Sequence, residues 1–248
     1  MTQALVMLSF GTSVPEARVS IEAVEKALGE AAAEYTAVRA YTSPTIRRIL
    51  AGRGEKVLSL TEALEQLYSE GVKRVLVQPT HLLYGYEYDK LKAEAEKYFD
   101  RFEKLIVGEP LLANHSDILR FAEKIVETCP RQQGEAIMYM GHGTGHAANA
   151  VYSALQTALN QAGRSDIYVG TVEGWPGLAE ILQMLKAPCK VRLLPLMLVA
   201  GDHARKDMAV VWKKELEQAG HMVQCAFTGL GELSWVQGMY QDKLMKIL

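Results

Sequence analysis

The segment YMGHGTGH, residues 139–146, ends a hydrophobic run that starts at Ala136. A short apolar run followed by glycines is typical of a buried strand that leads into a turn. Helical spacing resumes at about Ala147, so His142 is predicted in the loop at the carboxyl end of a strand, where open parallel sheets bind ligands. Glycines on both sides of His142 predict that another molecule can approach its ring. His146 is a weaker candidate, because these glycines disfavour a helix that would place both imidazoles on one face.

Strands and helices alternate on both sides of this segment. Before it, the sequence predicts strands at 5–9, 35–41, 75–78 and 105–107, and helices at 16–33, 45–51, 60–70, 87–102 and 117–129. From it onward, the sequence predicts strands at 136–140, 166–172, 191–198 and 222–227, and helices at 147–162, 177–186, 205–219 and 233–246. Short apolar strands separated by helices are typical of an α/β fold with parallel sheets.

The two series of elements match each other residue by residue. At a shift of 132 (142 minus 10), Phe10-Gly11-Thr12 matches His142-Gly143-Thr144, and Pro44 matches Pro176. At a shift of 116 (195 minus 79), Pro79 matches Pro195 and Gly85 matches Gly201. The shorter second shift predicts an extra helix in the first half, near 60–70. We therefore predict an internal duplication: two similar Rossmann-like or flavodoxin-like α/β halves, each with a parallel four-stranded sheet.

The boundary between the halves is expected near residue 115. This divides the chain into an N-terminal α/β lobe, residues 1–115, and a C-terminal lobe, residues 116–232, which would carry the site. A helix that follows the last strand of a lobe can cross to the other lobe. We expect the C-terminal helix, 233–248, to pack on the first lobe.

Composition excludes several classes of function. The chain has 248 residues, a formal net charge of −2, 49% hydrophobic residues and 23% charged residues, so neither a nucleic-acid surface nor a membrane surface is indicated. No signal peptide and no apolar run of about 20 residues is found. Three scattered cysteines fit free thiols in a reducing compartment, so we expect a cytoplasmic protein.

Residues at matching strand ends form the candidate site. In the first half these are Phe10, Tyr41 and Glu87, and in the second half they are His142, Glu173 and His203. If the halves face each other, these loops line one cleft. Two imidazoles and a carboxylate suit a divalent first-row metal with positions left open. Each residue alone also has a structural explanation, such as a helix cap or a turn contact.

Other ring side chains leave alternatives open. His81 lies in an apolar segment and is interpreted first as a hydrogen-bonded histidine of the core or of a cleft wall. Tyr84, Tyr86 and Tyr88 alternate around Glu87, and either line a flat pocket or pack on their own loop. Neither glycine-rich turn carries a dinucleotide-binding or P-loop motif, which disfavours nucleotide binding.

Five segments resemble the anaerobic sirohydrochlorin cobaltochelatases of the CbiK type, within the class II chelatases. They are 8–12, 78–87, 141–143, 172–176 and 194–203. The last two, VEGWP and LPLMLVAGDH, are the most specific, and the resemblance covers essentially the whole chain. It implies a chelatase that inserts Co²⁺ into sirohydrochlorin in the early-cobalt cobalamin pathway, on a bilobal fold that binds the tetrapyrrole.

The resemblance also implies roles for individual residues. Metal binding is expected at His142, Glu173 and His203, and catalysis at His142 and Glu87. Substrate contacts are expected at Phe10, Gly11, Thr12, Tyr88 and Gly143. Two alternatives stay open: a chelatase for Fe²⁺ or Ni²⁺, and a non-catalytic carrier of tetrapyrrole or metal on the same fold. The oligomeric state also stays open, with a homo-oligomer as one alternative.

Overall fold

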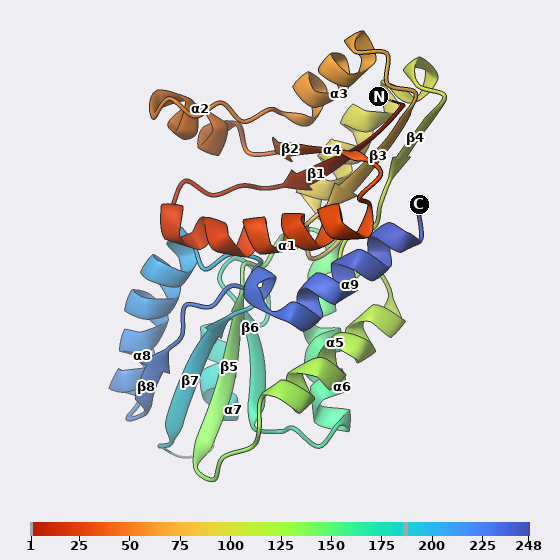
Figure 1. Cartoon of the computed structure of the whole chain (residues 1–248). Helices are drawn as coiled ribbons and strands as arrows, with labels where there is room; N and C mark the ends of the chain where they lie inside the picture. The colour runs from red at the N-terminus through yellow and green to blue at the C-terminus, as the bar shows by residue number, and fades with distance from the viewer. Residues whose placement is uncertain (1, 186–187) are drawn as a thin grey trace. The chain divides into compact units, whose positions relative to one another are not determined.

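The computed structural model describes residues 2–185 and 188–248, which contain two parallel four-stranded sheets (Figure 1). The first sheet has the order β2-β1-β3-β4, and its strands are β1 (Gln3–Ser9), β2 (Thr36–Tyr41), β3 (Arg74–Pro79) and β4 (Lys104–Val107). The second has the order β6-β5-β7-β8, and its strands are β5 (Glu135–Gly141), β6 (Ile167–Thr171), β7 (Lys190–Pro195) and β8 (Met222–Cys225). The predicted α/β fold with two parallel four-stranded sheets is confirmed.

The helices follow the predicted alternation with differences at their ends. In chain order they are α1 (Arg18–Ala31), α2 (Pro44–Gly52), α3 (Leu60–Ser69), α4 (Tyr86–Glu96), α5 (His115–Thr128), α6 (Ala150–Gln161), α7 (Leu178–Met184), α8 (Lys213–Gln218) and α9 (Ser234–Met245). Short 3₁₀ turns lie at Pro15–Ala17, Phe99–Arg101, Ala147–Asn149 and Leu230–Glu232. In the part of the chain that the structure describes, no helix is long and apolar enough to cross a membrane.

Three predicted elements differ from the structure. The helix predicted over 87–102 ends at Glu96, and a 3₁₀ turn follows. The strand predicted over 191–198 ends at Pro195, whose missing N–H fits the end of a ladder. The helix predicted over 205–219 begins as the π-helix η4 (Ala204–Trp212). The predicted helix 177–186 includes Lys186, which lies outside the described residues.

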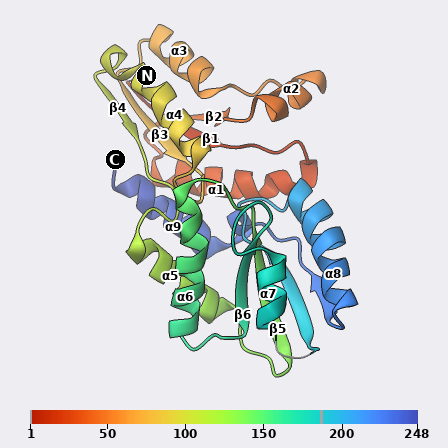
Figure 2. The same ribbon diagram turned by 180° about the vertical axis from the view of Figure 1, so that it is seen from behind.

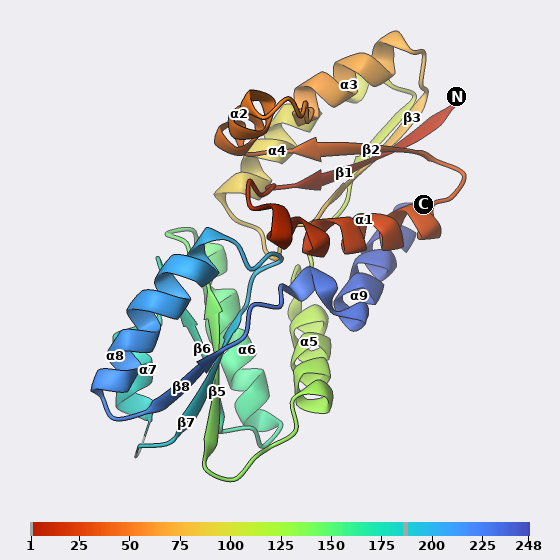
Figure 3. The ribbon, with the colours of Figure 1, turned by 60° about the vertical axis from the view of Figure 1, so that its left-hand side comes forward.

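The chain divides into two compact units. The first unit holds the chain up to Leu111 together with Gly231–Leu248, and the second holds Leu112–Leu230. The sequence placed these boundaries at 115 and 232. The C-terminal helix α9 packs against α1 within the first unit, side by side with it in Figures 1 and 3. The hydroxyl of Tyr240 on α9 donates to the carbonyl of Thr80 at 2.7 Å, which ties α9 to the end of β3.

In the first unit, helices cover both faces of the sheet. Figure 2 shows α4 in front of β1 and β3, and Leu60, Leu64, Tyr88 and Leu91 of α3 and α4 pack on Val6 and Val77 of those strands. Side chains alternate between the faces of a strand, so the buried Leu5 and Leu76 lie on the opposite face of the sheet, which α1 and α9 cover. Because both faces are covered, the strands are almost wholly apolar.

The second unit repeats this layering. Met138 and Met140 of β5 share a core with Ile181 of α7 and with Met208 and Trp212 of η4. The helices α5 and α6 pack against each other and cover the other face, as Figure 3 shows. In both units the loops after the strands gather at the carboxyl edge of the sheet.

The predicted alignment of the halves agrees with where the strands end. β1 and β5 end 132 residues apart (141 minus 9), and β3 and β7 end 116 residues apart (195 minus 79). Between β2 and β3 lie two helices, α2 and α3, whereas the described residues between β6 and β7 form α7 alone. The extra helix predicted near 60–70 is therefore α3.

Glycines shape the same turn in both copies. Gly11 and Gly143 have φ angles of 96° and 81°, a region that disfavours other L-residues. A Cβ on Gly143 would collide with the backbone nitrogen of Gly174, and one on Gly11 with the ring of Tyr41. A Cβ on Gly141 would collide with the ring of Tyr152. The glycines beside His142 are therefore needed to pack the turn against its own unit, whereas the sequence analysis had explained them by access for another molecule.

His81 is shielded but not hydrogen-bonded, which contradicts the expected satisfied histidine. Neither ring nitrogen is exposed or has a hydrogen-bond partner within the described residues, although other atoms of the residue retain some exposed surface. Burial lowers the pKa of His81 to about 4, and Glu87 opposes this shift. The imidazole is thus neutral in the folded chain at neutral pH.

We expect Gly143→Ala to lower the free energy of unfolding by about 3 kcal/mol, because it adds both a strained φ and a collision. The matched control is Gly163→Ala, where φ is 77° but no heavy atom lies within 4 Å of the added Cβ. That variant should cost only about 1 kcal/mol. Chemical denaturation measures both, and equal losses would contradict the packing explanation.

His81 predicts a pH dependence of stability. Its folded pKa lies below the usual value for histidine, so as pH falls from about 6.5 to 4 the unfolded chain takes up a proton that the folded chain does not. Between pH 6.5 and 4, the free energy of unfolding of the wild type should therefore fall by up to about 3 kcal/mol more than that of His81→Leu. Urea denaturation at several pH values tests this. His115→Leu, which removes an exposed histidine, serves as the control. If the stability of His81→Leu falls with pH as steeply as that of the wild type, the prediction is wrong.

Candidate metal site at the carboxyl edge of the second sheet

The three predicted ligands follow three neighbouring strands. β5 lies between β6 and β7, with Gly141 beside Thr171 and Met140 beside Pro195. His142 comes directly after β5, and Glu173 comes two residues after β6. His203 lies immediately before η4, in a helical turn that begins at Asp202 and ends the loop after β7. The strand order thus brings residues about 30 positions apart in the sequence to one edge of one sheet.

The two imidazoles are in contact. The ring centroids of His142 and His203 lie 4.5 Å apart, with an angle of 87° between the ring planes. Both side chains are partly open to solvent, at 45% and 39% exposed. Two histidines from different loops therefore meet edge to face at an accessible point of the second unit.

Each of these rings is held through Nδ1. His142 Nδ1 lies 2.9 Å from the carbonyl oxygen of Gly143, and His203 Nδ1 lies 2.7 Å from Oδ2 of Asp207. Both oxygens only accept hydrogen bonds, so Nδ1 is assigned the proton in each neutral ring. Within the described residues neither Nε2 atom has a hydrogen-bond partner, which leaves it a lone pair for a metal or a proton.

Glu173 lies next to His142 but on its Nδ1 side. Its Oε2 is 3.9 Å from His142 Nδ1, and its side chain is 60% exposed. Its backbone N–H donates to the carbonyl of His142 at 2.8 Å, which joins the two loops. Across the described ranges, no three His, Cys, Asp or Glu side chains are gathered tightly enough to hold a metal ion in this conformation. The two imidazoles are already in contact, and the carboxylate of Glu173 is near them but does not complete a three-ligand site.

Asn149 braces the loops that carry these ligands. Its Oδ1 accepts from the N–H of Thr144 at 3.0 Å, and its Nδ2 donates to the carbonyl of Trp175 at 2.6 Å. The side chain thereby bridges the turn after His142 and the loop after Glu173. Asn149 was not among the predicted site residues, although asparagine side chains commonly bond to nearby backbone groups.

His146 is not part of the imidazole pair. Its Nδ1 accepts from the backbone N–H of Ala148 at 3.0 Å, so it caps the 3₁₀ turn Ala147–Asn149. This agrees with its weaker rank in the sequence analysis.

The predicted residues of the first unit lie at its own carboxyl edge. Phe10 follows β1 and is 49% exposed. Glu87 lies in the first turn of α4, after β3, and accepts from Nζ of Lys90 at 2.7 Å. Both side chains are accessible, with the Glu87 side chain 36% exposed. Phe10 and Glu87 occupy the positions that match His142 and His203 in the second unit.

Of the residues predicted to contact substrate, only Phe10 is exposed, whereas Gly11, Thr12, Tyr88 and Gly143 are buried. The ring of Tyr88 lies in the core, edge to face with Tyr84, and its hydroxyl donates to the carbonyl of Gly108 at 3.0 Å. Burial raises the pKa of Tyr88 to about 12. Thr12 is also buried, and its hydroxyl oxygen accepts from the N–H of Val14. Tyr88 and Thr12 stabilise the first unit, and we do not propose a direct contact through either side chain.

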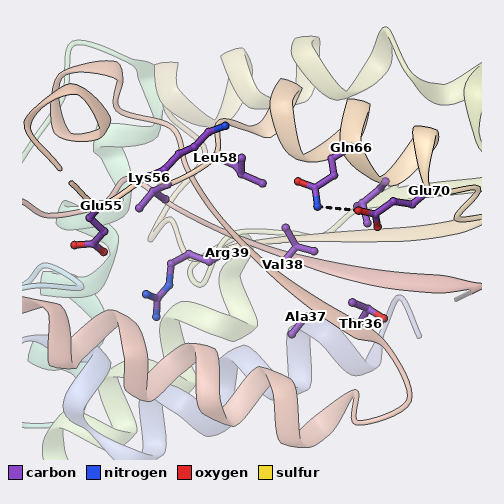
Figure 4. Close-up of a pocket in the computed structure, with 11 residues that line it drawn as sticks. Thr36, Ala37, Val38, Arg39, Glu55, Lys56, Leu58, Gln66 and Glu70 are labelled. Carbon is purple, nitrogen blue, oxygen red and sulfur yellow. Dashed lines mark hydrogen bonds between the residues drawn. The ribbon is translucent and has the colours of Figure 1, made fainter. Parts of the chain in front are cut away.

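A cavity of about 520 Å³ lies along the outer edge of β2 in the first unit (Figure 4). It is lined by side chains of β2, of residues 55–58 and of α3. Two charged side chains that line it are paired, Glu55 with Arg18 at 2.8 Å and Arg39 with Glu25. No predicted site residue lines this cavity, so it is not the candidate site.

Comparison with known proteins identifies the family of the chain. The family model described as cobalt chelatase (CbiK) matches residues 3–248. The sirohydrochlorin cobaltochelatase of Salmonella typhimurium is 34% identical over 257 aligned positions, covering 100% of this chain and 97% of that protein. The sirohydrochlorin cobaltochelatase CbiKC of Nitratidesulfovibrio vulgaris is 35% identical, covering 83% of this chain and 76% of that protein.

A solved structure shows the same fold. SirB from Bacillus subtilis, determined with Fe³⁺, superposes with a TM-score of 0.71 at 12% identity, covering 99% of this chain and 95% of that one. At this identity the likeness supports the architecture alone. The family match over nearly the whole length and the two relatives at 34% and 35% identity support more, and the chain belongs to the CbiK cobalt chelatase family.

Proposed function

We propose that this protein inserts Co²⁺ into sirohydrochlorin and so forms cobalt-sirohydrochlorin. The observation that carries the proposal is the contact between His142 and His203, whose ring centroids lie 4.5 Å apart and whose Nε2 atoms have no partner among residues 2–185 and 188–248. This pair lies at the ligand-binding edge of an open parallel sheet. Two curated members of the family carry the name sirohydrochlorin cobaltochelatase, which supports the substrate.

The proposed metal ligands are His142, Glu173 and His203. Imidazole nitrogens and a carboxylate suit Co²⁺ and its neighbours in the first transition row. Glu173 is exposed, so its side chain can rotate from the Nδ1 side of His142 toward a bound ion. A shell of three protein ligands leaves positions for water and for the incoming macrocycle nitrogens. An incomplete shell also suits a metal that must leave the protein.

Insertion replaces two pyrrole N–H protons by one divalent ion, so two protons must be accepted. We propose that His142 accepts one through Nε2, because an imidazole can take up a proton near neutral pH. The same nitrogen cannot hold the metal and the proton at once, so the metal leaves His142 before that transfer. Glu87 is the proposed second acceptor, and its salt bridge with Lys90 must open for this role.

We also propose which other metals the site accepts and where the protein is located. Fe²⁺ and Ni²⁺ share the ligand preferences of Co²⁺, so the site should accept them in vitro. A cytoplasmic location is supported by three free cysteines, Cys129, Cys189 and Cys225. A carrier that binds metal and tetrapyrrole without joining them is the competing function, and the assay below separates the two.

We expect His142→Ala and His203→Ala each to reduce the rate of cobalt insertion at least about 100-fold, because each removes a metal ligand. The absorbance change of sirohydrochlorin on mixing with Co²⁺ measures the rate against a reaction without protein. His115→Ala, which removes an exposed imidazole on α5, should keep the wild-type rate. Near-normal insertion by either site variant would overturn the metal assignment, and a wild type no faster than the blank would favour a carrier.

We expect Glu87→Gln to slow insertion about 10- to 100-fold while the Kd for Co²⁺ stays within twofold of wild type, because a proton acceptor is lost but no ligand. Calorimetric titration with Co²⁺ and the insertion assay together separate the two effects. Asp89→Asn removes a carboxylate two residues away on α4 and serves as the control. A weaker Co²⁺ affinity in Glu87→Gln would assign Glu87 to the metal instead.

A further inference from the structure

One of the two candidate imidazoles is bonded to a carboxylate that no prediction included. Oδ2 of Asp207 lies 2.7 Å from Nδ1 of His203, four residues earlier in the chain. A carboxylate without its proton only accepts, so the hydrogen of the neutral imidazole is held on Nδ1. The lone pair is then left on Nε2. Carboxylates that hold a metal-binding histidine in this way orient its ring and increase its basicity.

We propose that Asp207 is a positioning residue, which fixes His203 in the Nδ1–H tautomer and so presents Nε2 to the metal substrate. This inference rests on the proposed function, in which His203 is a metal ligand. It adds a residue whose effect on the metal is exerted through His203.

The helix that carries Asp207 is unusual and well anchored. Residues Ala204–Trp212 form a π-helix, in which the N–H of Lys213 reaches back five residues to the carbonyl of Met208. Ala204, Met208 and Trp212 are buried in the core of the second unit. Asp207 therefore precedes a fully buried residue on a helix packed into the core, and its carboxylate is held at a defined place. π-Helical turns are rare and are frequent at functional sites.

The apolar pattern accounts for the wide turns. Ala204, Met208, Trp212 and Leu216 are all buried and lie four residues apart. Four residues of an ideal α-helix rotate by about 400°, about 40° more than a full turn, so this row would drift away from the core. Wider turns bring the later residues back toward it. His203 and Asp207 are also four residues apart, so their hydrogen bond has the same spacing along the helix as the buried residues.

The two candidate histidines differ in how they are held. His142 donates to a neutral carbonyl, that of Gly143, whereas His203 donates to a carboxylate. Hydrogen bonds to charged acceptors are about twice as strong as neutral ones. His203 is therefore the better-supported donor to a cation, and His142 the one from which the metal separates more easily. This order matches the proposed role of His142 as a base after metal release.

The test compares Asp207→Asn with Asp202→Asn. An amide keeps the size of the side chain but removes its charge, and its NH₂ group can donate to Nδ1 and move the proton to Nε2. Asp202 adjoins His203 in the sequence, yet its exposed carboxylate pairs with Lys206 at 3.3 Å. We expect a 10- to 100-fold weaker Kd for Co²⁺ in Asp207→Asn, by calorimetry, and a change of less than twofold in Asp202→Asn.

A second measurement reads the tautomer without metal or substrate. Long-range ¹H–¹⁵N NMR of the metal-free protein distinguishes Nδ1–H from Nε2–H, with the His203 signals identified by their loss in His203→Ala. We expect Nδ1–H in the wild type and in Asp202→Asn, and a shift toward Nε2–H in Asp207→Asn. Asp207→Glu keeps a carboxylate and should recover both the tautomer and most of the affinity. Thermal melting confirms that each variant is folded.

The outcomes separate this inference from the proposed function. If His203→Ala weakens Co²⁺ binding but Asp207→Asn behaves like Asp202→Asn in affinity and tautomer, the role of Asp207 is overturned and the metal site stands. If His203→Ala binds Co²⁺ as tightly as the wild type, the metal assignment fails and this inference fails with it. Loss of affinity in Asp207→Asn with an unchanged Nδ1–H signal would also overturn the tautomer mechanism.

Discussion

The candidate site depends on the close approach of Gly143 to the backbone of Gly174. No side chain fits between them, and the φ of 81° at Gly143 turns the chain toward the loop that follows β6. The N–H of Glu173 then bonds to the carbonyl of His142, so two candidate ligands are joined through their backbones. Asn149 bridges the same two loops from one side. The site is therefore set mainly by main-chain geometry, with exposed side chains placed on a rigid base.

The first unit has the same turn without the candidate ligands. Gly11 has the same backbone conformation as Gly143, but it packs against the ring of Tyr41, where the second unit has Glu173. Phe10 replaces His142 at the exposed position. The duplicated fold thus preserves the turn and changes the side chains that the turn presents. Physical constraints on the backbone are shared by both copies, and the imidazole chemistry is confined to one.

Much of this arrangement follows from local sequence rules. Short apolar strands, their order and their carboxyl ends place His142, Glu173 and His203 at one edge, since a parallel sheet brings its strand ends together. A shielded His81 was expected, but the lack of hydrogen-bond partners for its ring nitrogens among the described residues was not. The burial of Tyr88 in the core was also not predicted, because it depends on packing against elements that are distant in the sequence. The hydrogen bond from His203 to Asp207 was also missed. The spacing of four between His203 and Asp207 can be read from the sequence. Many pairs on solvent-facing helices have the same spacing, however, so it does not by itself indicate a metal site.

The geometry also explains why a chelatase would leave its metal site unfinished. A site whose ligands converged completely would bind Co²⁺ tightly and retain it, since affinity gained in the bound state must be given up on transfer. Here one imidazole is held by a carboxylate and the other by a carbonyl, and the exposed Glu173 lies 3.9 Å from Nδ1 of His142. Such graded support lets ligands be exchanged one at a time for macrocycle nitrogens. In the proposed mechanism, His142 has the weaker support of the two rings and is the ligand whose release frees a base when a pyrrole proton must be taken.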